Sequence, residues 1–126
     1  MLLNLTNHPS ASWQDIQRLT AENLYTRVLD IPFPRIPPDE DEKYVAKIAD
    51  TYADDCEAIL RNYPDENNAV HIMGEFTFVA AAVNRLLRRG IACVASTTNR
   101  ITEEQDGVKV SKFVFSLFRA YIDELR

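Results

Sequence analysis

The chain has 126 residues, of which 46% are hydrophobic and 26% charged, and its formal net charge at pH 7 is −5. One domain suits this length, and the hydrophobic content is enough to bury a core without disulfide or metal support. The acidic balance argues against non-specific binding to duplex nucleic acid, although a local cluster of backbone N–H groups can still hold a small phosphate ligand.

The cysteines and the start of the chain set the expected compartment. Cys56 and Cys93 are isolated and lack the spacing of metal ligands, so they indicate core packing in a reducing environment. Residues 1–5 have no basic flank and turn polar at once, which indicates a first strand and not a signal peptide. No apolar run is long enough to span a membrane. We therefore expect a cytoplasmic protein with no membrane contact, no bound metal and no cofactor.

The chain begins with a predicted strand and helix. Residues 2–6 form an apolar strand that ends before Pro9, because a proline keeps the preceding residue out of the α region. Ser10 or Ser12 is then expected to cap a helix whose apolar residues recur at helical spacing. Ser12 with Asp15 three positions later approximates a capping box.

A second strand and a long helix follow. Residues 26–31 predict the strand, and four prolines within residues 32–38 predict an extended loop, since proline cannot continue a strand ladder. We expect Phe33 in this loop to pack back on the body of the domain. The acidic run 39–42 opens a helix with apolar residues at period 3.6, and Pro64 ends it.

The second half predicts a strand at residues 69–73, a helix at 77–89, and two further strands at 91–95 and 108–118 that form an antiparallel hairpin through the turn 103–107. The tail after this hairpin is expected to add one short helical turn within residues 119–126.

The alternation of strands and helices predicts the fold class. It favours a single α/β domain over residues 1–126, Rossmann-like and three-layered. We expect a mostly parallel five-stranded sheet of order 2-1-3-4-5, counted along the chain, that ends in the antiparallel hairpin.

Ligands of open α/β sheets bind at the carboxyl ends of strands, where the winding reverses. With this order the reversal lies between the first and third strands, which are followed by the turns 6–10 and 74–77. Both turns lead into helix N-termini, whose free N–H groups and positive potential suit an anion such as phosphate. The candidate ligand-binding residues of these turns are Thr6, Asn7, Ser10, Gly74 and Thr77.

Two side chains in these turns are candidate catalytic residues, and both have a purely structural alternative. His8 suits acid–base chemistry because histidine titrates near neutral pH, or it bonds locally within its loop. Glu75 can accept hydrogen bonds from ribose hydroxyls, or it interacts with the helix dipole. Gly74 either admits a ligand or makes a tight turn, and Thr77 either binds or caps the helix. His71, in mid-strand, is interpreted as a buried, hydrogen-bonded core histidine.

A polar run at residues 96–100 leaves the same edge of the sheet. Arg100 offers a guanidinium that could stabilise charge during catalysis. Lys112 on the partner strand is expected to face Arg100 across the hairpin and to join the ligand site, although a polar arm that protects an edge strand explains both cations equally well. The other candidate ligand-binding residues of the run are Ser96, Thr97 and Thr98.

Three features together resemble the small stand-alone CARF-type proteins of type III CRISPR systems. They are the strand ending in Asn4-Leu5-Thr6-Asn7-His8-Pro9-Ser10, the turn Met73-Gly74-Glu75-Phe76-Thr77 and the terminal hairpin. The resemblance covers most of the chain as topology and these few residues as motif. It implies an antiviral-defence protein that is a homodimer, with one cyclic oligoadenylate site built across the two-fold axis from two copies of these turns.

Some members of that family are metal-independent ring nucleases, in which a ribose 2′-hydroxyl attacks the adjacent phosphodiester and leaves a 2′,3′-cyclic phosphate. On this resemblance, Asn7 and His8 fall where the first loop meets the ligand, and Gly74, Glu75 and Thr77 fall at the second ligand turn. Neither turn contains a lysine or an arginine, so Arg100 or Lys112 would have to supply the positive charge.

Two other functions remain open at the level of the sequence. The same cleft suits a hydrolase, transferase or non-catalytic sensor for another nucleotide or phosphorylated ligand, with Glu75 as nucleophile or base. A dimeric interaction module without catalysis is the other, because an aromatic run near the end of the chain could supply a partner surface. That run consists of Phe113, Phe115, Phe118 and Tyr121.

Overall fold

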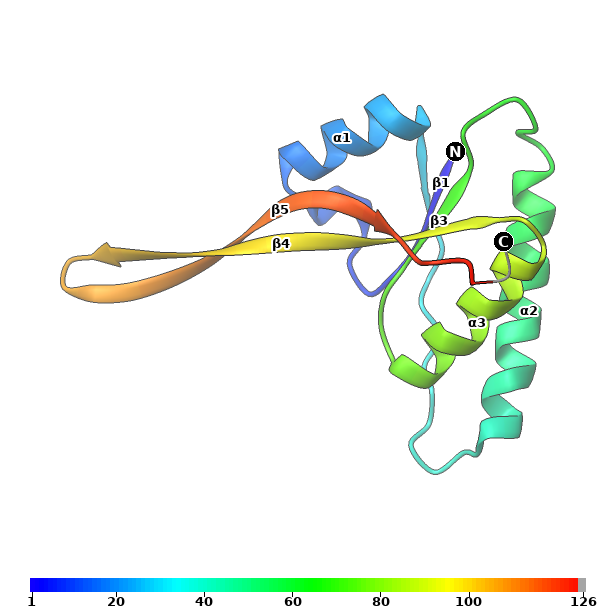
Figure 1. The fold of residues 1–126 in the computed structure, drawn as a ribbon. Helices are drawn as coiled ribbons and strands as arrows, with labels where there is room; N and C mark the ends of the chain where they lie inside the picture. Colours follow the sequence, from blue (N-terminus) through cyan, green and yellow to red (C-terminus); the bar gives the residue numbers. More distant parts are fainter. Residues whose placement is uncertain (125–126) are drawn as a thin grey trace.

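The computed structural model describes residues 1–124 and confirms the expected α/β class, with a five-stranded sheet of order β2-β1-β3-β4-β5 (Figure 1). The first four strands of the chain pair in parallel, and β5 is antiparallel to β4. The elements are β1 (Leu2–Leu5), the 3-10 turn η1 (Ser10–Ser12), α1 (Asp15–Tyr25), β2 (Val28–Asp30), α2 (Glu42–Leu60), β3 (Ala69–Ile72), α3 (Phe76–Arg88), β4 (Ala92–Gln105) and β5 (Val108–Ala120).

Helices cover both faces of the sheet, which gives the three expected layers. Figure 1 shows α1 on one side of β1 and β3, and α2 with α3 on the other. Leu3, Leu5 and Val70 are fully buried under α2 and α3, whereas Leu2 and Ala69 face α1. Successive residues of a strand point to opposite faces, so the short apolar strands supply both layers of core.

The proline-rich loop packs onto the larger core, as expected. The Phe33 ring lies edge-on to the Phe78 ring, with centroids 5.2 Å apart, and the Tyr52 ring makes a second edge contact with Phe78 at 5.5 Å. Phe78 is fully buried, and burying such a side chain is worth roughly 1.5–3 kcal/mol. A Cβ on Gly74 would lie only 2.3 Å from the Phe33 ring. The missing side chain of Gly74 therefore makes room for this loop.

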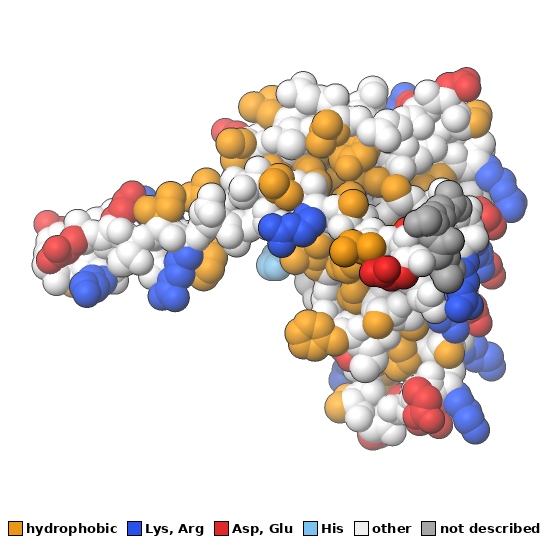
Figure 2. All heavy atoms as spheres, in the orientation of Figure 1, with side chains coloured by type: hydrophobic (Ala, Val, Ile, Leu, Met, Phe, Trp, Pro, Cys, Tyr) orange, Lys and Arg blue, Asp and Glu red, His pale blue; other side chains and the backbone are white. Residues whose placement is uncertain are grey.

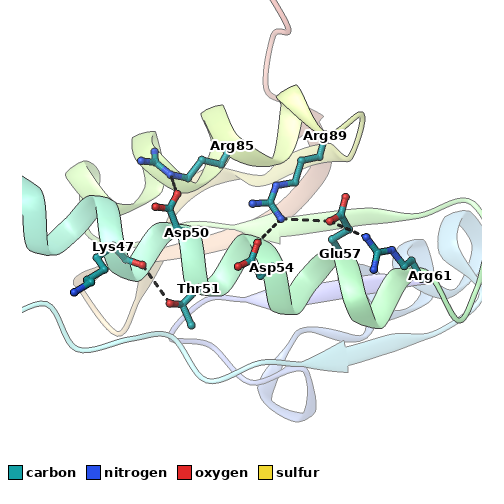
Figure 3. Close-up of polar contacts among 8 residues, drawn as sticks. All are labelled: Lys47, Asp50, Thr51, Asp54, Glu57, Arg61, Arg85 and Arg89. Carbon is teal, nitrogen blue, oxygen red and sulfur yellow. Dashed lines mark hydrogen bonds and ion pairs between the residues drawn. The ribbon is translucent and has the colours of Figure 1, made fainter.

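Ion pairs join the two helices on that face, and Figure 3 shows them in a row between α2 and α3. Arg85 pairs with Asp50, and Arg89 lies 2.8 Å from Asp54 and 3.4 Å from Glu57. Both arginines lie near the end of α3, where a cation also interacts favourably with the helix dipole.

The starts of α1 and α3 differ from the sequence prediction. Neither Ser10 nor Ser12 caps α1, because the chain first makes η1, in which the Ser12 hydroxyl donates to the Pro9 carbonyl at 2.7 Å. Gln14 takes the N-cap position of α1 without a side-chain cap bond, so the predicted capping box is wrong. At α3 the cap is Glu75 and not Thr77.

The hairpin is longer than predicted, because residues 96–105 continue β4 instead of forming a polar loop and a turn. β4 has 14 residues and β5 has 13, against 3 or 4 for each of the other strands. Residues 99–114, named the hairpin arm below, project away from the body of the molecule in Figure 1. Residues 121–123 have no helical structure and residue 124 lies in a turn, and the last two residues of the predicted helical turn, 125–126, lie outside the described part of the chain.

One irregularity separates the arm from the body. Ser96 pairs with Phe118 and Thr98 with Phe115, so β5 carries one extra residue opposite Thr97. This is a β-bulge, and the Thr97 hydroxyl bonds both the N–H and the carbonyl of Leu117 at 3.2 and 3.3 Å.

Candidate functional site

A pocket of about 450 Å³ lies on the α1 side of the sheet, at the carboxyl ends of β1 and β3. This is the expected point of winding reversal, and the volume lies within the usual range for small-ligand sites. Thr98 and Phe115, the residues on either side of the hairpin arm, also line the pocket. Its lining residues come from the 6–8 and 73–74 turns, the segment 12–17 from the end of η1 into α1, β3 and the two long strands. They are Thr6, Asn7, His8, Ser12, Trp13, Gln14, Gln17, His71, Met73, Gly74, Ser96, Thr98 and Phe115.

The turn after β1 is held by Asn4, a fully buried polar residue in an apolar strand. Its side-chain amide donates to the His8 carbonyl at 2.8 Å and to the Asp30 carboxylate at 2.9 Å. Its oxygen accepts from the Thr6 hydroxyl at 2.9 Å, and that hydroxyl also accepts the His8 N–H at 3.1 Å. The Trp13 indole N–H bonds the His8 carbonyl as well, at 3.1 Å. These bonds fix the backbone that carries His8.

Asp30, at the end of β2, extends this support to the start of η1. Its carboxylate accepts from the Ser10 N–H at 3.1 Å and from the Ser10 hydroxyl at 3.0 Å. Ser10 is therefore engaged by Asp30 and does not line the pocket. Because Asp30 bonds both Asn4 and Ser10, the two ends of the turn are tied to one side chain.

His71 is buried and hydrogen-bonded, as the sequence indicated, and it also lines the pocket. Its Nδ1 lies 2.9 Å from the Asn4 oxygen, which can only accept, so Nδ1 carries the proton. The other ring nitrogen, Nε2, is a buried acceptor with no partner among the described residues. Burial, and secondarily the charge of His8, lower the pKa of His71 from 6.5 to about 4. The ring is therefore neutral at physiological pH.

Gln14 attaches the arm to α1 beside the pocket. Its side chain donates to the Phe113 carbonyl at 2.7 Å and accepts from the Phe115 N–H at 2.9 Å. The amide thus pairs with the open edge of β5 as a neighbouring strand would. This contact sets the arm against the first turn of α1 and places Phe115, which is 4% exposed, in the floor of the pocket.

The structure brings six of the predicted site residues together. Three come from the turn after β1, one from the turn after β3, and two from β4 beside them. They are Thr6, Asn7, His8, Gly74, Ser96 and Thr98.

The carboxylate of Glu75 is engaged at the start of α3 and does not line the pocket. It accepts from the Phe78 N–H at 2.8 Å and from the Thr77 hydroxyl and N–H. These bonds, led by the one from the Thr77 hydroxyl, lower the pKa of Glu75. The N–H groups that we expected to receive an anion at this helix therefore bind a carboxylate of the chain itself.

The remaining predicted residues lie along the hairpin. Arg100 bonds the Ser111 hydroxyl at 3.2 Å, and Thr97 is engaged in the bulge. Lys112 is opposite Ile101 and not Arg100, so the expected facing pair is wrong, and its amine lies 3.1 Å from Glu103. No lysine or arginine is among the described residues that line the pocket. The lining consists of amides, hydroxyls, aromatic rings, the two histidines, Met73 and Gly74.

Several residues that line the pocket or support its main turn were missed in the sequence. Asn4 and Asp30 had a usable signal, since each is a polar residue within or ending an otherwise apolar strand. Trp13, Gln14 and Phe115 had none, because their helical or strand spacing indicates ordinary packing. Among residues 1–124, no group of three or more His, Cys, Asp or Glu side chains could hold a metal ion.

The fold and the pocket define a Rossmann-like α/β protein with a cavity at the switch point of its sheet and a projecting two-stranded arm. The chain belongs to the uncharacterized protein MJ1673 family, whose sequence model matches residues 1–119. The search of curated proteins found no match, and the search of solved structures found none either. Within the described residues, no helix is long and apolar enough to cross a membrane.

Proposed function

We propose that the switch-point pocket binds a nucleotide ligand, and that cyclic oligoadenylates are the first candidates. One observation carries the proposal: a cavity of about 450 Å³ lies where the sheet's winding reverses, and the backbone of its main turn is fixed by Asn4 and Asp30. A fixed turn favours binding, because little conformational entropy is lost when the ligand enters.

The lining suits the uncharged part of a nucleotide. Trp13 and Phe115 supply apolar surface, while Asn7, Gln17 and Thr98 offer amide and hydroxyl groups. Apolar walls with a few placed polar groups are the usual composition of small-molecule sites. Since no lysine or arginine is among the described residues that line the pocket, affinity is expected to come from the base and the ribose hydroxyls more than from the phosphates.

Cleavage of the ligand, if it occurs, depends on His8. In that reaction the ribose 2′-oxygen forms a bond to phosphorus and loses its proton to the His8 imidazole. The bond from phosphorus to the 5′-oxygen of the next nucleotide breaks, and that oxygen takes up a proton. A 2′,3′-cyclic phosphate and a 5′-hydroxyl result. Glu75 and Arg100 are engaged elsewhere, so binding without turnover is the simpler form of the proposal.

The test is calorimetric titration of the protein with cyclic tetra-adenylate and cyclic hexa-adenylate, followed by chromatography of the incubated ligand. Micromolar or tighter binding that falls at least tenfold in Asn7→Ala or Thr98→Val supports the proposal. Glu22→Gln, an exposed change on α1 away from the pocket lining, is the matched control. If cleavage is seen, His8→Ala should lower turnover more than affinity.

A thermal-shift screen of other nucleotides distinguishes the ligand classes, since a ligand bound to the folded state raises the melting temperature by mass action. A rise in melting temperature with another nucleotide, and none with cyclic oligoadenylates, would identify that nucleotide as the ligand of the pocket. No binding of any nucleotide at 100 µM protein, about the limit of calorimetric detection for weak ligands, would refute the proposal.

A further inference from the structure

The hairpin arm is a two-stranded ribbon with little support from the rest of the chain. β3 pairs with β4 only from Ala92 to Val94, so the β4 edge is open along the whole arm. On the β5 edge, Gln14 reaches only Phe113 and Phe115. An isolated two-stranded hairpin is marginally stable in water, and unpaired strand edges are templates for further pairing. Figure 2 shows that the arm carries charged side chains of both signs.

The backbone groups that point to the open β4 edge can be identified from two independent features. Asp106 and Gly107 have φ values of 51° and 79°, which define a two-residue type I′ turn, so Gln105 and Val108 flanking it bond each other. Gln14 bonds the outward groups of Phe113 and Phe115, whose partners across the ladder are Arg100 and Thr98.

Both features give the same alternation, because hydrogen-bonded pairs in an antiparallel ladder alternate with pairs that face outward. The residues whose N–H and carbonyl groups point out along the β4 edge of the arm are Arg100, Thr102 and Glu104.

This edge is complementary to itself. If two copies of β4 pair antiparallel about a two-fold axis at Thr102, each Arg100 lies opposite the Glu104 of the other copy, and the two Thr102 residues lie opposite each other. Opposite charges and threonine pairs directly across a ladder are favourable. Each Glu104 is also opposite Lys109 within its own arm, so charges of alternating sign lie across three of the four strands, and Phe113 occupies the fourth. The β5 edge carries Lys109 and Lys112 with no acidic residue between them.

We propose that a second copy of this chain pairs with the arm along the β4 edge, centred on Thr102, to form a continuous four-stranded sheet. The interface is isologous, since the same strand is used by both copies. Continued by two residues beyond the Arg100–Glu104 pair, the register brings Asp106 of the second copy opposite Thr98, which lines the pocket. The partner's arm tip, and not its switch-point turns, would then stand beside the ligand site.

The test is sedimentation equilibrium of the full chain and of two variants, each of which removes one outward-pointing N–H group from one edge of the arm. Proline lacks the N–H group and is tolerated in a strand only where that group faces an open edge. Thr102→Pro should therefore keep the hairpin and weaken self-association more than tenfold. Ser111→Pro places the same change on the opposite, β5 edge and should leave the dimer intact. Circular dichroism verifies that both variants fold.

Charge reversal gives a second, independent test. Arg100→Glu places two glutamates opposite each other, and Glu104→Arg places two arginines opposite each other, so each variant alone should be monomeric. Mixed in equal amounts, they should form a heterodimer, because every facing pair is again of opposite charge. A monomeric parent chain, a dimer unaffected by Thr102→Pro, or two reversed variants that do not associate when mixed would each overturn the proposal.

Discussion

Acidification should destabilise the protein through His71, and the size of the effect can be worked from its environment. The pKa of this histidine falls from 6.5 to about 4 in the folded state, first because the ring is desolvated by burial and then because His8 is nearby. Above pH 6.5 the ring is neutral in both states and contributes no pH dependence. Between pH 6.5 and 4 the unfolded chain binds a proton that the folded chain does not bind, so stability falls as the pH falls.

The magnitude follows from the difference in proton affinity. Each tenfold change in affinity is worth about 1.4 kcal/mol, so a fall from 6.5 to about 4 removes about 3 kcal/mol of stability by pH 4. His71 is only 2% exposed, so solvent does not screen this contribution appreciably. Such a loss is a large fraction of the stability of a typical domain.

The assay is urea unfolding between pH 4 and 8 for the parent chain and for His71→Asn, whose side-chain amide can donate to Asn4 in place of Nδ1. The variant has its own packing cost, so the informative quantity is the change in stability with pH and not its absolute value. The parent should lose about 3 kcal/mol more than the variant between pH 7 and 4. Equal pH dependence in the two proteins, or a His71 pKa near 6.5 by nuclear magnetic resonance, would refute the reasoning.

Three further predictions follow from the same contacts. Gly74→Ala should destabilise the fold by about 1–3 kcal/mol because the new Cβ meets the Phe33 ring, and Phe33→Leu in the same chain should recover part of the loss in thermal unfolding. Glu75→Ala should lower the free energy of unfolding by about 1 kcal/mol through the lost cap of α3 while leaving ligand affinity within twofold. A large loss of affinity in titration would instead show that Glu75 takes part in ligand binding. Cys56 and Cys93, whose thiol pKa values are raised to about 12 mainly by burial, should react with iodoacetamide only under denaturing conditions, and rapid alkylation of the native protein would contradict this.

The strand order could be predicted because its signals are local and repeated. Short apolar runs such as residues 69–72 end in polar turns, and the intervening stretches have helical spacing, so few topologies remain. The location of the pocket followed from that order. The hairpin arm could not be predicted in the same way, since residues 98–105 are exposed on both faces and carry no alternation that separates a strand from a loop.

The roles of individual side chains were harder to predict because they depend on which neighbour is nearest. Glu75 and Thr77 are both reasonable caps in the sequence, and only the fold shows the carboxylate accepting from the helix N–H groups. Asn4 is a single polar residue in a strand. Its structural role depends on its hydrogen bonds to His71 and Asp30, which lie 67 and 26 positions away in the chain. Spacing along the sequence does not encode such contacts.

The bulge at Thr97 determines the face of the sheet to which the aromatic residues Phe115 and Phe118 point. Regular alternation would place Phe115 and Phe118 on opposite faces, but the extra residue between them turns both toward α1, with ring centroids 4.9 Å apart. Loss of one residue from 116–117 would rotate Phe115 out of the pocket floor and invert the outer half of β5. Insertions or deletions that preserve the pocket are therefore expected in the arm as matched pairs of residues, two in each strand, and not at the bulge.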